Sequence, residues 1–173
     1  MALTVLLGGA RSGKSALAVR LARKHDGPVT YVATCPRIEG DDDLADRIAR
    51  HRAERPVAWE TIEEQHDLAG ALADAGEAFA IVDCLTTWVG NLMFRGDDPA
   101  AIESASERAI DAASSRSTPT VVISNEVGLG IVPESPLGRE YRDVLGRVNQ
   151  QWAAAADRAL FLVAGKALRL EDP

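Results

Sequence analysis

The sequence of 173 residues is poor in cysteine, in aromatic residues and in positive charge. Two cysteines, Cys35 and Cys84, do not make a disulfide framework, and no Cys-x-x-Cys pair suggests a zinc site. The net charge of −7 argues against nucleic acid or an anionic membrane as a partner, because both require a basic surface. No apolar run approaches the ~20 residues of a membrane span, and no basic amino-terminal segment predicts a signal peptide. We therefore expect a cytoplasmic protein.

The composition is that of an ordinary globular protein, with 46% hydrophobic and 26% charged residues. We expect one catalytic domain over residues 1–173. Short apolar segments resemble buried parallel strands at 3–7, 29–33, 79–82, 121–124 and 160–163. Amphipathic segments between them predict helices near 14–25, 41–55, 65–75, 85–95, 98–115 and 137–156. This alternation predicts an α/β fold, a mostly parallel central sheet flanked by helices, with ligands at the carboxyl ends of the strands.

The first predicted strand runs directly into a glycine-rich turn that precedes a helix-forming segment. The turn has the pattern G-x-x-x-x-G-K-S of a phosphate-binding loop, formed by Gly8, Gly9, Ala10, Arg11, Ser12, Gly13, Lys14 and Ser15. Backbone N–H groups of such a turn and the positive end of the next helix favour phosphate. Lys14 is predicted to reach the outer phosphates, and the Ser15 hydroxyl is predicted to ligate Mg²⁺. A glycine-rich turn without this function would not need all four fixed residues, so we expect a nucleoside triphosphate site.

A second carboxylate for the metal is predicted at the end of the strand over 79–82. This apolar run ends in Asp83, as in the Walker B pattern. Many strands end in aspartate, and the pattern gains weight here because a phosphate-binding loop accompanies it. The alternative is that Asp83 caps the helix that begins near Leu85.

Glu126 follows the strand predicted over 121–124, whose carboxyl end should open into the same crevice. There its carboxylate could orient an attacking hydroxyl or hold a magnesium-bound water. Alternatively, Asn125, Gly128 and Gly130 build a turn that leaves Glu126 in solvent. The residues alone favour neither interpretation.

Three histidines are present, and His51 is the one predicted to face the protein. In the helix predicted over 41–55, positions 44, 48, 51 and 55 share one face, and Leu44 and Ile48 must point inward. Arginines at positions 47, 50 and 52 surround that face. Nearby guanidinium groups lower the pKa of an imidazole and keep it neutral, as a nucleophile requires. The alternative, which the residues alone favour, is a half-buried structural histidine among solvated arginines.

In order along the chain, these segments resemble the family of bifunctional adenosylcobinamide kinase / adenosylcobinamide-phosphate guanylyltransferase of cobalamin biosynthesis. The resemblance extends from about residue 3 to residue 165. Besides the phosphate-binding loop and His51, the matching positions are 31–34, 47–48, 55–56, 59, 63, 86–87, 91–92, 125–128, 130–133 and 146–150. A phosphate-binding loop alone would not be specific, whereas the Asn-Glu-Val-Gly segment that begins at Asn125 and the helix of His51 are.

The resemblance implies a RecA-like P-loop fold, a homotrimer and two reactions at one site. In the first, ATP or GTP phosphorylates adenosylcobinamide. In the second, GTP guanylylates His51, and the GMP passes to adenosylcobinamide phosphate to give adenosylcobinamide-GDP. Besides the phosphate-binding loop, the nucleotide contacts that the resemblance implies are Ala33, Thr34, Cys35, Arg52, Ala53, Glu54, Arg55, Glu63 and Asp83.

Two positions vary within the family that the chain resembles. Glutamate as well as aspartate occurs at position 83, so Asp83 keeps the charge but reaches less far. The residue before His51 also varies, and here it is Arg50.

Two rival functions share the phosphate-binding loop. A monofunctional P-loop kinase that acts on another small alcohol would use Lys14 and Asp83 but leave His51 idle. A nucleotide-sensing module would bind nucleotide without turnover, although no regulatory tail or repeat in the sequence favours it.

Overall fold

The computed structural model describes residues 3–36, 49, 52–53 and 55–171. Within these residues, seven strands form one sheet in the order β3-β2-β4-β5-β1-β6-β7. All neighbouring pairs are parallel except β6 and β7. The strands are β1 (Leu3–Gly8), β2 (Val29–Ala33), β3 (Glu60–Glu63), β4 (Phe79–Asp83), β5 (Thr120–Ile123), β6 (Arg158–Val163) and β7 (Lys166–Leu170).

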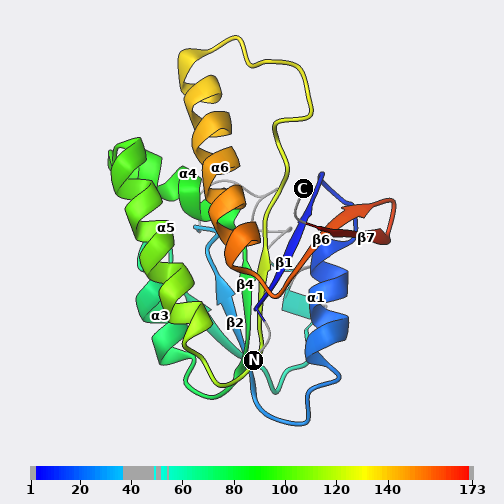
Figure 1. The fold of residues 1–173 in the computed structure, drawn as a ribbon. Coiled ribbons are helices and arrows are strands. Elements are labelled where there is room, and N and C mark those ends of the chain that lie inside the picture. The colour runs from blue at the N-terminus through cyan, green and yellow to red at the C-terminus, as the bar shows by residue number, and fades with distance from the viewer. Residues whose placement is uncertain (1–2, 37–48, 50–51, 54, 172–173) are drawn as a thin grey trace.

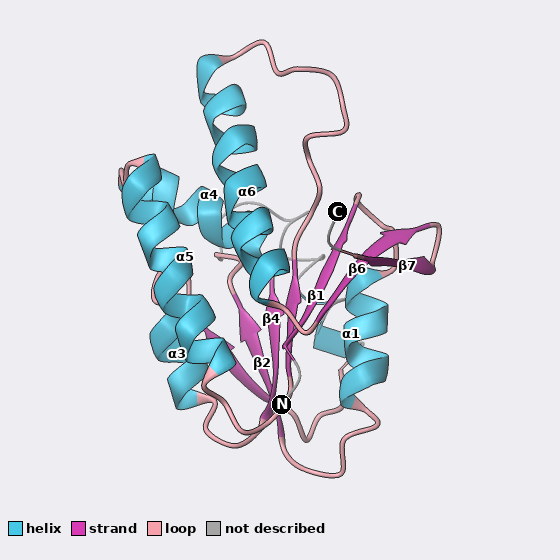
Figure 2. Ribbon diagram, viewed as in Figure 1, coloured by secondary structure: helices cyan, strands magenta, loops and turns pink. Residues whose placement is uncertain are grey.

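The described helices pack on both faces of this sheet (Figures 1 and 2). They are α1 (Lys14–Ala22), α3 (Leu68–Asp74), α4 (Leu85–Arg95), α5 (Pro99–Ser114) and α6 (Pro136–Ala155). Helix α1 covers one face, and α3, α4, α5 and α6 cover the other. None of the helices in the described ranges combines the length and the hydrophobicity needed to cross a bilayer.

Strand alternation sends successive side chains to these two layers. Along β1, Val5 packs with residues of α4, α5 and α6, whereas Leu6 packs with the layer that contains Ala18 of α1. Both Val5 and Leu6 have no exposed surface. A strand that is buried on both faces needs a continuous apolar run, which is the pattern that the sequence shows for β1, β4 and β5.

Three helices begin at side-chain caps that the sequence contains. Asp67, Asp98 and Ser135 each accept a hydrogen bond from the backbone N–H three residues later. Proline follows two of these caps directly, as Pro99 and Pro136. A capping side chain satisfies an N–H group that has no partner inside the helix, and proline at the first helical position lacks that N–H altogether.

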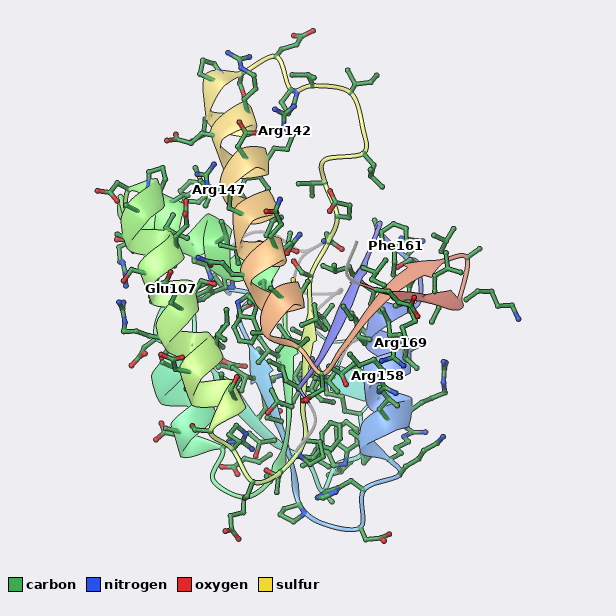
Figure 3. The ribbon with its side chains drawn as sticks, viewed as in Figure 1. Glu107, Arg142, Arg147, Arg158, Phe161 and Arg169 are labelled. Atoms are coloured by element: carbon green, nitrogen blue, oxygen red, sulfur yellow. The ribbon has the colours of Figure 1, made fainter. Side chains whose placement is uncertain are left out.

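Figure 3 labels Arg147 of α6, whose Nε donates to Glu103 Oε1 of α5 at 2.6 Å. Both side chains are partly exposed, so this ion pair adds little stability by itself. The ion pair joins α5 to α6 on the outer side of the apolar contact between these two helices.

The five predicted strands and the expected sheet are confirmed, with bounds that differ by a residue or two. Two strands, β3 and β7, were not predicted. Both lie at sheet edges, and neither has a continuous apolar run, because one face or both faces meet solvent. Helix α6, predicted near 137–156, turns Tyr141, Leu145, Val148 and Trp152 toward the core, whereas Ala155 in its last turn is exposed.

The helix predicted over 41–55 lies mostly outside the described residues. Where the chain is described, it is helical at residues 49, 52 and 53.

Arg116, just before β5, is a buried cation that holds carbonyl groups of two other segments. Its Nη1 donates to Leu72 O at 2.5 Å, its Nη2 donates to Ala78 O, and its Nε donates to Thr120 Oγ1 at 3.1 Å. Only 8% of the residue is exposed, and burial lowers the pKa of its guanidinium group. The hydrogen bonds therefore compensate for the loss of water around the charge.

Replacing Arg116 with methionine is expected to lower the free energy of unfolding by about 3 kcal/mol, because buried carbonyl groups lose their donors. Urea denaturation monitored by circular dichroism would measure this change. The matched control is Arg108→Met on α5, where the exposed guanidinium donates to the Ser104 hydroxyl of the same helix. A similar loss in both variants would contradict the role given to Arg116.

Candidate nucleotide-binding site

The phosphate-binding loop joins β1 to α1, and its backbone requires glycine at two positions. Gly8 has φ +147°, and a Cβ there would lie 2.4 Å from Leu162 O of β6. Gly13 has φ +100° and forms the N-cap of α1. By contrast, a Cβ at Gly9 would meet nothing within 4 Å. The fold itself therefore requires Gly8 and Gly13, whereas Gly9 leaves space beside the loop.

Lys14 is held inside this loop. Its Nζ donates to Gly8 O at 2.9 Å, to Gly9 O at 2.7 Å and to Ser12 Oγ at 3.4 Å. The residue is buried, and this burial lowers the pKa of its ammonium group, against the opposing charge of Asp83. A triphosphate offers stronger acceptors than these neutral oxygens, so the lysine is placed to exchange loop contacts for phosphate contacts.

A hairpin late in the chain supports the loop from the side. Gly165, in the turn between β6 and β7, donates its N–H to Ser12 O at 3.0 Å. Gly165 and its neighbour Ala164 both have positive φ, at +76° and +50°, as a tight hairpin turn requires. No motif in the sequence indicated this contact; the only local signal was the Ala-Gly pair between two short apolar runs.

Asp83 lies at the carboxyl end of β4, beside the start of α1. Its Oδ2 accepts a hydrogen bond from Ser15 Oγ at 3.3 Å and another from Tyr31 OH. The alternative that Asp83 caps α4 is wrong, because Cys84 is the N-cap residue and makes no side-chain cap. The predicted association of Ser15 with a Walker B acid is thus present in the fold, although β5 separates β4 from β1 in the sheet.

The Ser15 and Asp83 side chains fit Mg²⁺, which prefers hard oxygen ligands. Among the described residues, no group of three or more histidine, cysteine or acidic side chains could hold a metal. A magnesium ion in a phosphate-binding loop does not need such a group, because phosphate oxygens and water complete its coordination. Two adjacent protein oxygens therefore fit an ion that phosphate also ligates, and the magnesium site stays a prediction.

Arg55 and Tyr31 form a stacked pair next to Asp83. The Arg55 Cζ lies 3.2 Å from the centroid of the Tyr31 ring, which is cation–π geometry. Tyr31 is 1% exposed, and burial, followed by the charge of Asp83, raises the pKa of its hydroxyl well above the usual value. Arg55 Nε and Nη1 are buried and have no hydrogen-bond partner within the described ranges. A desolvated guanidinium with donors left over is suited to an anionic ligand.

The remaining predicted nucleotide contacts lie around the ends of β2 and β3. Ala33 pairs with Asp83 in register, and Glu63 ends β3 in an ion pair with Arg52. Thr34 is buried, and its hydroxyl bonds to both the N–H and the C=O of Cys84. Cys35 is half-buried, whereas Ala53 is exposed. Ala33, Thr34 and Glu63 thus lie at the carboxyl ends of the parallel strands, where the phosphate-binding loop also lies.

Glu126 stabilises its own turn in the described structure. Its Oε1 accepts the N–H of Gly128 at 2.6 Å and the residue is half-buried, whereas the turn interpretation left Glu126 in solvent. Its backbone N–H also donates to Gly8 O at 3.2 Å, so the residue adjoins the phosphate-binding loop. A role for its carboxylate in the reaction remains a prediction.

His51 and Glu54 lie outside the described residues. Of the inward face predicted around His51, only position 55 is described. Arg55 contacts the Tyr31 ring, but it lies in a bend and not in a helix, so the shared helical face stays a prediction.

Several of the matching polar residues join α4 and α6 to the segments that follow β2 and β5. Thr86 Oγ1 accepts the N–H of Asn125 at 2.8 Å, Asn91 Nδ2 donates to Thr34 O at 2.8 Å, and Asn149 Nδ2 donates to Asn125 O at 3.1 Å. These residues fix the segments that follow β2 and β5. Tyr31 belongs to the matching segment 31–34, but no role was predicted for it; the available signal was a phenol within an apolar strand.

Comparisons with known proteins give a consistent result. The sequence model of the family described as cobinamide kinase / cobinamide phosphate guanyltransferase matches residues 4–170. The bifunctional adenosylcobalamin biosynthesis protein CobP of Pseudomonas aeruginosa is 41% identical over 169 residues, which cover 96% of each chain. The bifunctional adenosylcobalamin biosynthesis protein CobU of Escherichia coli is 42% identical over 182 residues, covering 96% of this chain and 98% of the relative.

Solved structures with low sequence identity share the fold. The RadB recombinase aligns with a TM-score of 0.55 at 16% identity, covering 92% of this chain and 73% of that protein. A prototypical ATPase from the type III secretion system of pathogenic bacteria aligns with a TM-score of 0.55 at 12% identity. The match covers 94% of this chain but only 51% of that ATPase. The expected RecA-like architecture is confirmed by these likenesses.

Proposed function

The chain belongs to the cobinamide kinase / cobinamide phosphate guanyltransferase family, and we propose that it carries out both reactions of that family. The substrates are adenosylcobinamide, its phosphate, and ATP or GTP. The observation that carries the proposal is the convergence of Lys14, Ser15 and Asp83 at one edge of the sheet, with Arg55 stacked beside them.

In the kinase reaction, the hydroxyl oxygen of adenosylcobinamide attacks the γ-phosphorus of the nucleotide. The bond from that phosphorus to the bridging oxygen breaks, and the nucleoside diphosphate leaves. Lys14 offsets the negative charge on the phosphates, and the loop N–H groups orient them. The proton of the attacking hydroxyl requires an acceptor, for which Glu126 is the candidate.

In the guanylyl transfer, a ring nitrogen of His51 attacks the α-phosphorus of GTP, and pyrophosphate leaves. A phosphate oxygen of adenosylcobinamide phosphate then attacks the same phosphorus, releases the histidine and forms adenosylcobinamide-GDP. Covalent catalysis divides a transfer between two bulky anions into two displacements. The same loop thus serves attack at either phosphorus.

Ser15 and Asp83 are the residues that would hold Mg²⁺, which neutralises charge on the phosphates when it is bound. Arg52, Arg55 and Glu63 are proposed as further nucleotide contacts, together with the segments 33–35 and 52–55. Arg52 and Glu63 form an ion pair with each other, so nucleotide binding would exchange or extend that ion pair.

The proposal is tested by incubating the protein with GTP labelled with ³²P at the α-phosphate. We expect label on the protein that is labile to acid and stable to base, as a phosphoramidate bond to histidine is. The label should pass to adenosylcobinamide phosphate when that acceptor is added. A protein that phosphorylates adenosylcobinamide but takes up no label would instead be a monofunctional kinase.

We also propose that the chain forms a homotrimer. The segment between β5 and α6 extends beyond the carboxyl edge of the sheet (Figure 1), and it exposes several large apolar side chains. They are Leu129 at 78%, Ile131 at 98% and Val132 at 58% exposure, and Leu137 in the first turn of α6 extends the group at 62% exposure. A group of this kind on a projecting segment suits contact with another copy of the chain.

Sedimentation velocity should therefore show a mass near three times the 18.4 kDa of one chain. Replacing Ile131 with aspartate is expected to shift the mass toward that of the monomer, since the charge would be buried at the contact. Phe94→Asp, which alters an apolar side chain with 93% exposure at the end of α4, serves as the control. A trimer that persists in the Ile131 variant would place the contact elsewhere.

A further inference from the structure

Tyr31 touches two groups of the candidate site that are far apart in sequence. In the sheet register, Tyr31 of β2 pairs with Ile81 of β4, and Ala33 pairs with Asp83. Side chains two residues apart on a strand share a face, so Tyr31 and Asp83 lie on the same face as α1. That helix begins with the loop residues Lys14 and Ser15.

The Tyr31 hydroxyl holds one oxygen of the Asp83 carboxylate. It donates to Oδ2, the same oxygen that accepts the hydrogen bond of Ser15. Two donors on one oxygen restrict the rotation of the carboxylate about its Cβ–Cγ bond. The orientation of the acid beside Ser15 is therefore set from β2, not only from the loop.

The face of the Tyr31 ring supports Arg55, while the hydroxyl holds Asp83. The ring belongs to the apolar layer between the sheet and α1 and cannot change its position without disturbing that layer. The Arg55 guanidinium rests on it with Cζ at 3.2 Å from the ring centroid. Arg55 Nε and Nη1 are buried without a hydrogen-bond partner among the described residues, so stacking on the ring is a contact through which a described side chain can position them.

We propose that Tyr31 is a positioning residue that sets the spacing between Asp83, which is the proposed metal ligand, and Arg55, which is the proposed nucleotide contact. One rigid, buried side chain fixes both groups through two different interactions. The inference rests on the proposed function, because it assigns the nucleotide and Mg²⁺ to this site. Tyr31 itself needs no contact with substrate for this role.

The two interactions can be removed separately. Tyr31→Phe deletes the hydroxyl and keeps the ring, so it tests the hold on Asp83. Tyr31→Leu deletes the ring, so it tests the support of Arg55 and can be compared with Arg55→Ala. The matched control is Tyr141→Phe, because the half-buried Tyr141 also donates its hydroxyl at 3.0 Å, but to the backbone of Thr86.

The measurement is equilibrium binding of a fluorescent GDP analogue, first with EDTA and then with Mg²⁺. For Tyr31→Phe we expect a nucleotide affinity in EDTA within about twofold of wild type. The increase in affinity on adding Mg²⁺ should be about tenfold smaller than in wild type. Tyr141→Phe should retain both values. A Tyr31→Phe protein whose response to Mg²⁺ equals that of wild type would overturn the hold on Asp83.

The support of Arg55 is tested by a double-mutant cycle in EDTA. Tyr31→Leu and Arg55→Ala should each weaken binding about tenfold, and the double variant should be no weaker than the worse single variant. If the loss of affinity in the double variant equalled the product of the two single losses, the coupling between Tyr31 and Arg55 would be overturned. Unfolding curves of all variants show which proteins are folded, and Tyr31→Phe, with its ring intact, tests the proposal even if Tyr31→Leu does not fold.

Failure of the proposed function has a different signature. If the wild-type protein takes up no label from GTP but Tyr31→Phe loses its response to Mg²⁺, the guanylyl transfer is wrong and the positioning role stands. If wild type is labelled and Tyr31→Phe binds nucleotide as wild type does, the positioning role is wrong and the proposed function stands.

Discussion

Replacing Lys14 with alanine is expected to reduce kcat/KM of both the kinase and the guanylyl transfer by about 10³-fold or more. Both reactions use the same triphosphate cradle, and Lys14 supplies its buried positive charge. The ammonium group now bonds to Gly8 O, Gly9 O and Ser12 Oγ. Without it, a bound triphosphate faces loop carbonyls that repel the phosphate oxygens. Assays of each half-reaction with separately prepared substrates would measure the two losses.

The Lys14 variant needs a control for folding, since alanine also removes three hydrogen bonds from the loop. Lys14→Met keeps the length of the side chain and should be as inactive as Lys14→Ala. Lys166→Ala, on the exposed strand β7, should retain both activities. If one reaction survived in a folded Lys14 variant, the two reactions would not share the phosphate-binding loop.

Replacing His51 with alanine is expected to abolish guanylyl transfer while at least part of the kinase activity remains. The nucleophile of the second reaction is lost, whereas attack at the γ-phosphorus does not use it. Removal of a covalent nucleophile costs about 10⁴-fold or more. The checks are the disappearance of GMP-labelled protein and a direct assay of adenosylcobinamide phosphate formation.

His66→Ala provides the matched control for the histidine experiment. His66 is half-buried before α3, and its backbone C=O accepts the Trp88 indole at 2.8 Å, an interaction that alanine would keep. This variant should still take up label. Equal loss of both reactions in a folded His51 variant would give the histidine a different role.

The sequence predicted the strands and helices well where a single property determines them. The continuous apolar runs of β1, β4 and β5 and the G-K-S turn are local features, and the structure has them where they were expected. The edge strands β3 and β7 were missed because a strand that is buried on one face or on neither has no continuous apolar run, as the fully exposed β7 illustrates.

The sequence predicted those residues of the site whose role follows from a short local motif. The Ser15 and Asp83 oxygens are types that bind Mg²⁺, and their positions at a turn and a strand end were readable from the sequence. The Tyr31 contacts were not, since the pairing of β2 with β4 brings Asp83 to the hydroxyl from 52 positions away, and the bend before β3 brings Arg55 to the ring from 24 positions away. Contacts of that range depend on tertiary packing, which the residue types at positions 31 and 55 do not specify.

The place of β1 inside the sheet has a consequence for synthesis on the ribosome. Its neighbours are β5 and β6, which begin at Thr120 and Arg158. More than a hundred further residues must therefore be synthesised after the glycine-rich turn before β1 can pair with a strand on either side. Nucleotide affinity should appear late in translation, after the segment that carries Gly165 has emerged and closed against Ser12.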